Sequence, residues 1–215
     1  MLTATGATLR ENLEGAENFD PEVIRPLDKP FRPMGSHAVL KGNLAPKGVV
    51  VKRVAVPKKM MAHRGPAKVY EDCESAMDAI RGGRVKEGDV IVIRYEGPKG
   101  GPGMREMIDI TRTLSSINCE DKIALVTDGR FSGYSSGAVF GHCSPEAQEG
   151  GPIAIVRDGD VISYDIGQRT IHLEISDEEI AARLKEWKPK DNSRKGYLGR
   201  YARSVSSGAE GAVIR

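Results

Sequence analysis

Two apolar runs, each followed directly by a glycine-rich polar segment, constrain the fold of this chain most strongly. The runs are DVIVIRY at residues 89–95 and KIALVT at residues 122–127. Because they are almost continuously apolar, they are typical of strands that are buried on both faces of a sheet. Between them, the apolar residues of 104–117 recur at helical spacing. The middle of the chain is therefore predicted to form a β-α-β unit.

Further strands are predicted on both sides of this unit. Runs rich in β-branched residues indicate strands at 49–56, 67–70 and 170–175. The dipeptide Asp158-Gly159 is typical of a hairpin turn, here between strands at 153–157 and 161–165. The chain is thus predicted to be rich in strands at both ends.

Three more helices complete the prediction. One spans 73–81 after the capping residue Asp72, one runs from the capping box at Ser176 to about Trp187, and one spans 197–207. This order of elements predicts an α/β domain with a mixed, barrel-like sheet and helices packed outside. It is not the order of a doubly wound sheet, because hairpins interrupt the alternation.

The first 38 residues differ from the rest of the chain. Pro21, Pro26, Pro30 and Pro33 lie among charged residues there, and prolines at this density prevent a regular element. We expect residues 1–38 to form an arm or an interdomain linker, with a short helix at 8–14. The folded body is expected to span 39–215.

Composition excludes several classes of function. The chain has 215 residues and a net charge of +2, with no basic stripe of the kind that binds nucleic acid. No apolar run approaches the roughly 20 residues of a membrane span, and the N-terminus has no apolar signal core, so a cytoplasmic protein is expected. Cys73, Cys119 and Cys143 are far apart, which favours reduced structural thiols over a metal site.

The first candidate site segment follows the predicted strand at 89–95. The strand ends at Glu96, and the loop at 97–103 contains four glycines, including Gly100 and Gly101, and two prolines. Ligands of α/β sheets bind beside such loops, because glycines allow close backbone approach. The alternative is a tight structural turn.

The second segment, TDGRFSG at 127–133, follows the other buried strand. It lacks the G-x-S-x-G pattern of a hydrolase nucleophile elbow. Ser132 is a candidate for a catalytic or substrate-binding serine, with Arg130 nearby and Gly133 beside it. The alternative is a capping or turn serine.

The third segment is GHCSPEA at 141–147. Ser144 before Pro145 predicts a helix N-cap and first helical turn. His142 could act as a general base, or it could be a structural histidine of a loop.

These three segments together resemble the dihydroxy-acid dehydratase and phosphogluconate dehydratase family. Four more segments carry the resemblance: LKGNLAP at 40–46, GPA at 65–67, GDV at 88–90 and WKP at 187–189. The likeness covers almost the whole chain but only the family's C-terminal domain, and it implies a swivelling β/β/α domain. Phe131 favours the dihydroxy-acid type over the sugar-acid type.

The resemblance also implies an activity and a distribution of roles. Family enzymes remove water from a small 2,3-dihydroxy acid to give a 2-keto acid. By motif match, Ser132 takes the place of the catalytic base and Glu96 that of a magnesium ligand, while Arg130, Gly133, Gly100 and Gly101 lie where substrate binds. In the family, the iron–sulfur cluster and most Mg²⁺ ligands belong to an N-terminal half, so this chain is expected to hold neither cofactor alone. It is expected to need that half as its partner and to be inactive without it. Homodimers are common in the family, and one is expected here.

One departure and three alternatives remain open. The family usually continues after Phe131-Ser132-Gly133 with a small residue and Thr-Arg-Gly, whereas this chain has YSSG at 134–137. The departure bears on whether the substrate is the usual branched-chain acid. The alternatives are a non-catalytic binding module, a fragment of a sugar-acid dehydratase, and a small isomerase subunit with a similar domain.

Overall fold

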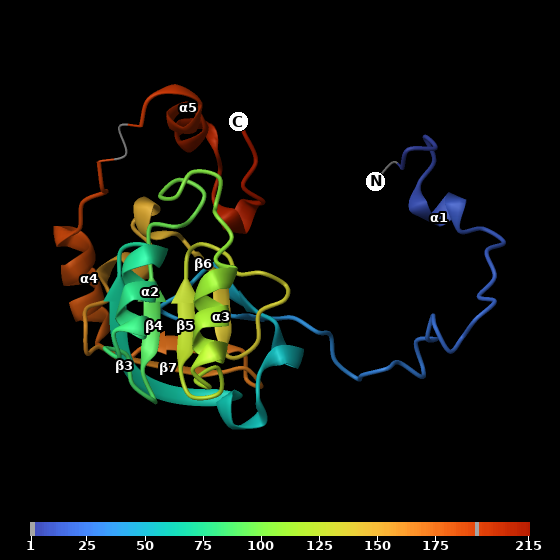
Figure 1. The fold of residues 1–215 in the computed structure, drawn as a ribbon. Coiled ribbons are helices and arrows are strands. Elements are labelled where there is room, and N and C mark those ends of the chain that lie inside the picture. Colours follow the sequence, from blue (N-terminus) through green and yellow to red (C-terminus); the bar gives the residue numbers. More distant parts are fainter. Residues whose placement is uncertain (1–2, 192–193) are drawn as a thin grey trace. The chain divides into compact units, whose positions relative to one another are not determined.

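The computed structural model describes residues 3–191 and 194–215 (Figure 1). The chain divides into two compact units, residues 1–35 and 36–215. In the first unit, helix α1 (Leu9–Asn12) is capped by Thr8, whose hydroxyl accepts from the Glu11 backbone N–H. The predicted helix at 8–14 is therefore present in shorter form, and the proline-rich stretch after it contains no regular helix or strand.

The described part of the second unit forms an eight-stranded sheet in the order β1-β2-β6-β5-β4-β3-β7-β8. The pairs β3·β4, β4·β5 and β5·β6 are parallel, and the other neighbours are antiparallel. The strands are β1 (Ala38–Leu40), β2 (Gly48–Val51), β3 (Ala62–Tyr70), β4 (Val90–Ile93), β5 (Ala124–Thr127), β6 (Val139–Ser144), β7 (Val161–Asp165) and β8 (Thr170–Leu173).

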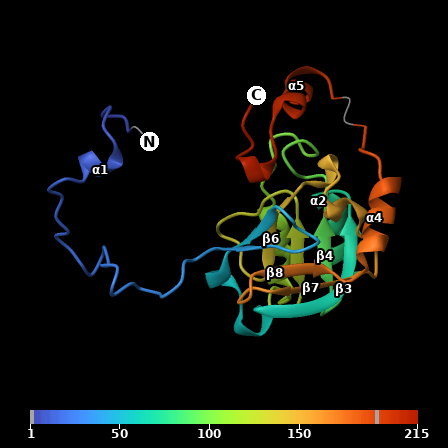
Figure 2. The ribbon, with the colours of Figure 1, turned by 180° about the vertical axis from the view of Figure 1, so that it is seen from behind.

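The two ends of this sheet come together. Lys41, directly after β1, forms a parallel bridge to Thr170 at the start of β8. Its N–H donates to the Arg169 carbonyl, and its carbonyl accepts from the Ile171 N–H, both at 3.0 Å. The sheet is therefore nearly closed, which confirms the predicted barrel-like fold. Figure 2 shows β7 and β8 running across the side opposite the helices.

The central strands are buried on both faces. Val90 and Val92 of β4 point into the barrel core, where they join Phe140. Ile91 and Ile93 of the same strand point outward and pack with residues of α2 (Cys73–Arg81) and α3 (Ile108–Ser116). Figure 1 shows these two helices covering β4 and β5. The unbroken apolar run at 89–95 thus has the physical cause that was predicted.

Capping residues place the other helices largely as predicted. Asp72 accepts from the Ser75 N–H at 2.7 Å at the start of α2. The Ser176 hydroxyl accepts from the Glu179 N–H at 3.2 Å, and α4 (Asp177–Glu186) begins after it. Helix α5 spans Gly196–Ser204. Short 3₁₀ helices lie at Arg53–Ala55, Lys58–Met60, Ala147–Glu149, Pro152–Ile155 and Gly208–Glu210.

The predicted hairpin at Asp158-Gly159 is wrong. Pro152–Ile155 is a 3₁₀ helix, and the hairpin that does form joins β7 to β8. The turn instead binds β3, because the Asp158 carboxylate accepts from the Val69 N–H and the Gly159 N–H donates to the Ala67 carbonyl.

Two strands depart most from their predicted bounds. The strand at 49–56 ends at Val51, and a 3₁₀ turn follows, with the Val54 N–H bonded to the Ser36 carbonyl. The strand at 67–70 is the second half of β3. The first half of β3 pairs antiparallel with β7 and the second half pairs parallel with β4, so Pro66 lies where the partner changes.

Two further predictions near the candidate site are corrected. The helix predicted from residue 104 begins at Ile108, because Met104 has a left-handed backbone (φ 54°) and Glu106 bridges to Arg130. The segment at 141–147 is not a loop leading to a capped helix. His142 and Cys143 lie in strand β6, which ends at Ser144.

Candidate functional site

The candidate site lies where the parallel strands end. Strands β3, β4, β5 and β6 point the same way, so their carboxyl ends share one edge of the sheet, at the top of β4 and β5 in Figure 1. An acidic residue follows each strand within a few positions: Glu71, Glu96, Asp128 and Glu146. This edge is the place where α/β proteins bind ligands.

Asp128 connects three of the loops at this edge. Its side chain is 1% exposed. One carboxylate oxygen accepts from the Tyr95 N–H at 3.0 Å and the Ala147 N–H at 2.8 Å, and the other accepts from the Glu96 N–H at 3.0 Å. Burial outweighs these donors and raises the pKa of Asp128 to about 6. Asp128 thereby fixes the backbone that carries Glu96.

Glu146 fixes the backbone of the glycine-rich loop at 97–103 in the same way. Its buried carboxylate accepts from the Lys99 N–H at 2.9 and 3.1 Å and from the Gly100 N–H at 2.8 Å. Burial is again the largest cause that raises its pKa, to about 7. The sequence interpretation gave no role to Asp128 or Glu146. The available signal was an acidic residue directly or closely behind a predicted apolar strand.

Gly100 and Gly101 allow the loop to lie against the end of β4. A Cβ on Gly101 would come within 2.9 Å of the Glu96 Cα and 3.0 Å of its Oε2. A Cβ on Gly100 would come within 2.9 Å of the Tyr95 Cα. No ordinary Cβ contact is this short, so both positions need glycine for packing alone.

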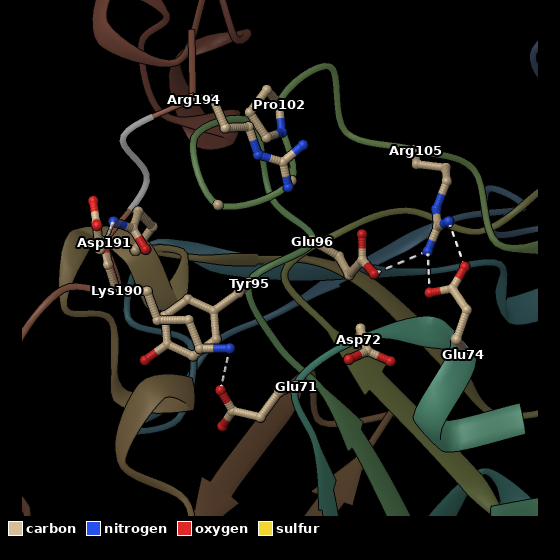
Figure 3. A pocket seen from close by; sticks show the side chains of 13 residues that line it. Glu71, Asp72, Glu74, Tyr95, Glu96, Pro102, Arg105, Lys190, Asp191 and Arg194 are labelled. Carbon is tan, nitrogen blue, oxygen red and sulfur yellow. Dashed lines mark hydrogen bonds and ion pairs between the residues drawn. The ribbon is translucent and has the colours of Figure 1, made fainter. Parts of the chain in front are cut away.

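Glu96 presents its carboxylate to a cavity of about 610 Å³. Its Oε1 accepts from the Cys73 N–H at 3.1 Å and pairs with the Arg105 guanidinium at 3.1 Å, while Arg105 also binds Glu74 (Figure 3). Among the described residues, Glu96 Oε2 has no hydrogen-bond partner. An oxygen of this kind suits a hard cation such as Mg²⁺. Within 3–191 and 194–215, no group of three or more His, Cys, Asp or Glu is arranged to hold a metal ion.

Charged residues of both signs surround this cavity. The acids lining it are Glu71, Asp72, Glu74, Glu96 and Asp191, and the bases are Arg105, Lys190 and Arg194. Lys190 pairs with Glu71, and its ammonium lies 4.2 Å from the centre of the Tyr95 ring (Figure 3). Gly100 and Gly101 line the same cavity, so three of the predicted site residues come together here.

Ser132 and Gly133 line a second cavity of about 220 Å³. The Ser132 hydroxyl accepts from the Tyr134 N–H at 3.1 Å. The Lys52 ammonium donates to the Gly133 carbonyl. His37 and His142 also line this cavity. The sequence interpretation missed Lys52, which lies 80 positions from Ser132 in the chain and carries no motif of its own.

Arg130 lies outside both cavities. Its side chain is exposed, and together with burial it lowers the pKa of His142. The loop that Arg130 belongs to nevertheless packs against the end of β4, because a Cβ on Gly129 would lie 2.8 Å from the Glu96 Cβ. Cys73, Cys119 and Cys143 are unpaired thiols, and burial raises the pKa of Cys73 to about 11.

Comparisons with known proteins place the chain in a family. Residues 22–212 match the model of the dihydroxy-acid/6-phosphogluconate dehydratase C-terminal domain. The dihydroxy-acid dehydratase of Acetivibrio thermocellus is 55% identical over 215 residues, which are 100% of this chain and 39% of that protein. The dihydroxy-acid dehydratases of Agathobacter rectalis (54%, covering 99% of this chain and 38% of that protein) and Ruminiclostridium cellulolyticum (50%, covering 100% and 39%) are similar.

The chain corresponds to only part of these relatives. It spans about 39% of the length of the curated relatives that it matches. No helix among the described residues is long and apolar enough to cross a membrane. The matched model and the identities show that this chain belongs to the dihydroxy-acid/6-phosphogluconate dehydratase family and corresponds to its C-terminal domain.

Proposed function

We propose that this chain is the C-terminal half of a cytoplasmic hydro-lyase, a dihydroxy-acid dehydratase that converts 2,3-dihydroxy acids into 2-keto acids for branched-chain amino acid biosynthesis. The relatives that carry this name match the chain from end to end. The observation that carries the proposal is the placement of Glu96 and Ser132. They follow the adjacent parallel strands β4 and β5, and each lines a cavity.

Glu96 is the residue of this chain that would hold Mg²⁺. Its Oε2 is unpartnered among the described residues, and its backbone is fixed by Asp128. A single carboxylate does not complete a magnesium site, which needs about six oxygen ligands. The remaining ligands and the iron–sulfur cluster are proposed to come from an N-terminal half.

Ser132 acts as the base in this proposal. As an alkoxide it takes the proton from C2 of the substrate, and the electron pair of that C–H bond forms the double bond between C2 and C3. The bond from C3 to its hydroxyl oxygen breaks, the hydroxyl and a proton leave as water, and the enol tautomerises to the keto acid. When bound, the cluster supplies the Lewis acidity that the leaving hydroxyl needs.

The other predicted site residues have separate parts. Gly133 leaves open space beside Ser132 for the substrate, since nothing lies within 4 Å of where its Cβ would be. Gly100 and Gly101 hold the loop that borders the Glu96 cavity. Arg130 is exposed at the same edge, where an acidic substrate or the N-terminal half can meet it. We also propose that the complete enzyme is a homodimer.

The test is an assay of the chain joined with a cluster-bearing N-terminal half. With 2,3-dihydroxyisovalerate as substrate, we expect keto-acid formation, and we expect Ser132→Ala to lower kcat by roughly 10²- to 10⁴-fold. Ser136→Ala is the matched control, because Ser136 is exposed on the same loop and does not line the Ser132 cavity. Full activity of Ser132→Ala would remove its role as base. Turnover of a sugar acid in place of the branched-chain acid would move the protein to the sugar-acid type.

A further inference from the structure

The Glu96 cavity and the Ser132 cavity differ in charge. The Glu96 cavity is lined by five carboxylates and three basic side chains. Among the described residues that line the Ser132 cavity, none is an acid, and the ionisable ones are Lys52, His37 and His142. A cavity with a cation and without carboxylates favours a negative charge inside it. The serine therefore lies in the part of the site that this chain itself makes electropositive.

Lys52 is the cation that the sheet places there. It follows directly on β2, which pairs with β6, and β6 pairs with β5, the strand that leads to Ser132. The Lys52 side chain is half-buried, and its ammonium donates to the carbonyl of Gly133, one residue beyond Ser132. Within the described ranges it forms no ion pair with an acid. Its charge is therefore not neutralised by a neighbour.

We propose that Lys52 is a positioning residue for Ser132 and that its charge also favours ionisation of the Ser132 hydroxyl to the alkoxide. This inference rests on the proposed role of Ser132 as base. A serine hydroxyl is a very weak acid, and a fixed cation close to it favours the ionised form. The hydroxyl gives its proton to solvent, the alkoxide takes the C2 proton of the substrate, and Lys52 stays protonated throughout. The hydrogen bond to Gly133 holds the loop in the geometry that this needs.

Other charged groups near Ser132 are less suited to this task. His142 on β6 lines the cavity, but burial and Arg130 lower its pKa, so it favours the neutral form. His37, before β1, bonds to Ser36. Arg130 lies on the loop of Ser132 itself and does not line the cavity. Lys52 is thus the cation lining this cavity that bonds to the loop of Ser132.

The test compares Lys52→Met, Lys52→Ala and Lys52→Arg in the complete dehydratase, with Lys58→Met as control. Lys58 is exposed at the start of the 3₁₀ helix Lys58–Met60 and lines neither cavity. We expect Lys52→Met to lower kcat on the order of 100-fold with KM changed only a few-fold, as for loss of one charge-stabilising donor. Lys52→Arg should keep part of the activity, and ethylammonium added to Lys52→Ala should restore part of it. The rising limb of the pH profile should move to higher pH in Lys52→Met.

The outcomes separate this inference from the proposed function. If Ser132→Ala is inactive but Lys52→Met keeps its kcat, Lys52 has no such role and the function stands. If Lys52→Met loses activity with an unchanged pH profile and without amine rescue, its role is only structural and the inference fails. If Ser132→Ala itself keeps full activity, both the base and its partner are wrong.

Discussion

The loop at 97–107 and the loop at 131–137 follow neighbouring strands, yet they are built differently. The first is anchored by the buried Glu146 carboxylate, and Asp128 binds Tyr95 and Glu96 just before it. Gly100 and Gly101 of this loop lie against the backbone of Tyr95 and Glu96. The second surrounds Gly133 with open space, and its Tyr134 is 88% exposed. Glycines in similar motifs therefore serve two purposes. Gly100 and Gly101 let the first loop pack on the chain itself, whereas Gly133 leaves open space in the second loop.

Replacing Asp128 is the change with the largest expected effect on this comparison. Asp128→Ala leaves the N–H groups of Tyr95, Glu96 and Ala147 without their acceptor inside the protein. An unpaired buried donor costs about 1–3 kcal/mol, so we expect the free energy of unfolding to fall by about 3 kcal/mol. Urea denaturation followed by circular dichroism measures this.

The matched change in the other loop is Tyr134→Ala. Because this side chain is almost fully exposed, we expect the free energy of unfolding to change by less than about 0.5 kcal/mol. Equal losses for Asp128→Ala and Tyr134→Ala would contradict the difference between the two loops. Asp128→Asn, which keeps one acceptor oxygen, should fall between the two.

Glu146, which anchors the first loop, should also make the free energy of unfolding depend on pH. Burial raises its pKa from 4.5 to about 7, so between these values the folded chain binds more protons than the unfolded chain. The free energy of unfolding must then decrease as pH rises from about 4.5 to 7, by about 3 kcal/mol from this group. Asp128, whose pKa is also raised, acts in the same direction.

Glu146→Gln isolates this contribution, because glutamine keeps an acceptor for the Lys99 and Gly100 N–H groups but does not titrate. We expect the slope of stability against pH to become flatter in this variant, measured by urea denaturation at a series of pH values. Glu186→Gln is the control, since Glu186 is exposed, pairs with Arg157 and has no part in binding the loop backbone. A slope that stays the same in Glu146→Gln would show that the burial of this carboxyl does not control the effect.

The sequence predicted the strands of the site better than its anchors. Strands β4 and β5 were identifiable because a strand buried on both faces leaves an unbroken apolar run, and this also placed Glu96 and Ser132 at their ends. Strand β6 was missed because Gly141 and His142, with its left-handed φ of 59°, interrupt any strand pattern. Asp128 and Glu146 bind backbone groups 19 to 47 positions away. No local pattern encodes such a partner, since it depends on which strands become neighbours.

The smallest expected effect on stability is that of Gly133→Ala. Its backbone has an ordinary φ, and a Cβ there meets no atom within 4 Å, so we expect a change within about 0.5 kcal/mol. Gly101→Ala should instead destabilise by about 1–3 kcal/mol, because its Cβ would collide with Glu96. For activity, in contrast to stability, we expect Gly133→Ala to have the larger effect of the two. In the complete enzyme, a stable Gly133→Ala variant with a raised KM would mean that substrate occupies the space beside Ser132. Unchanged kcat and KM would mean that this space is left empty, and the glycine would then have no role in binding.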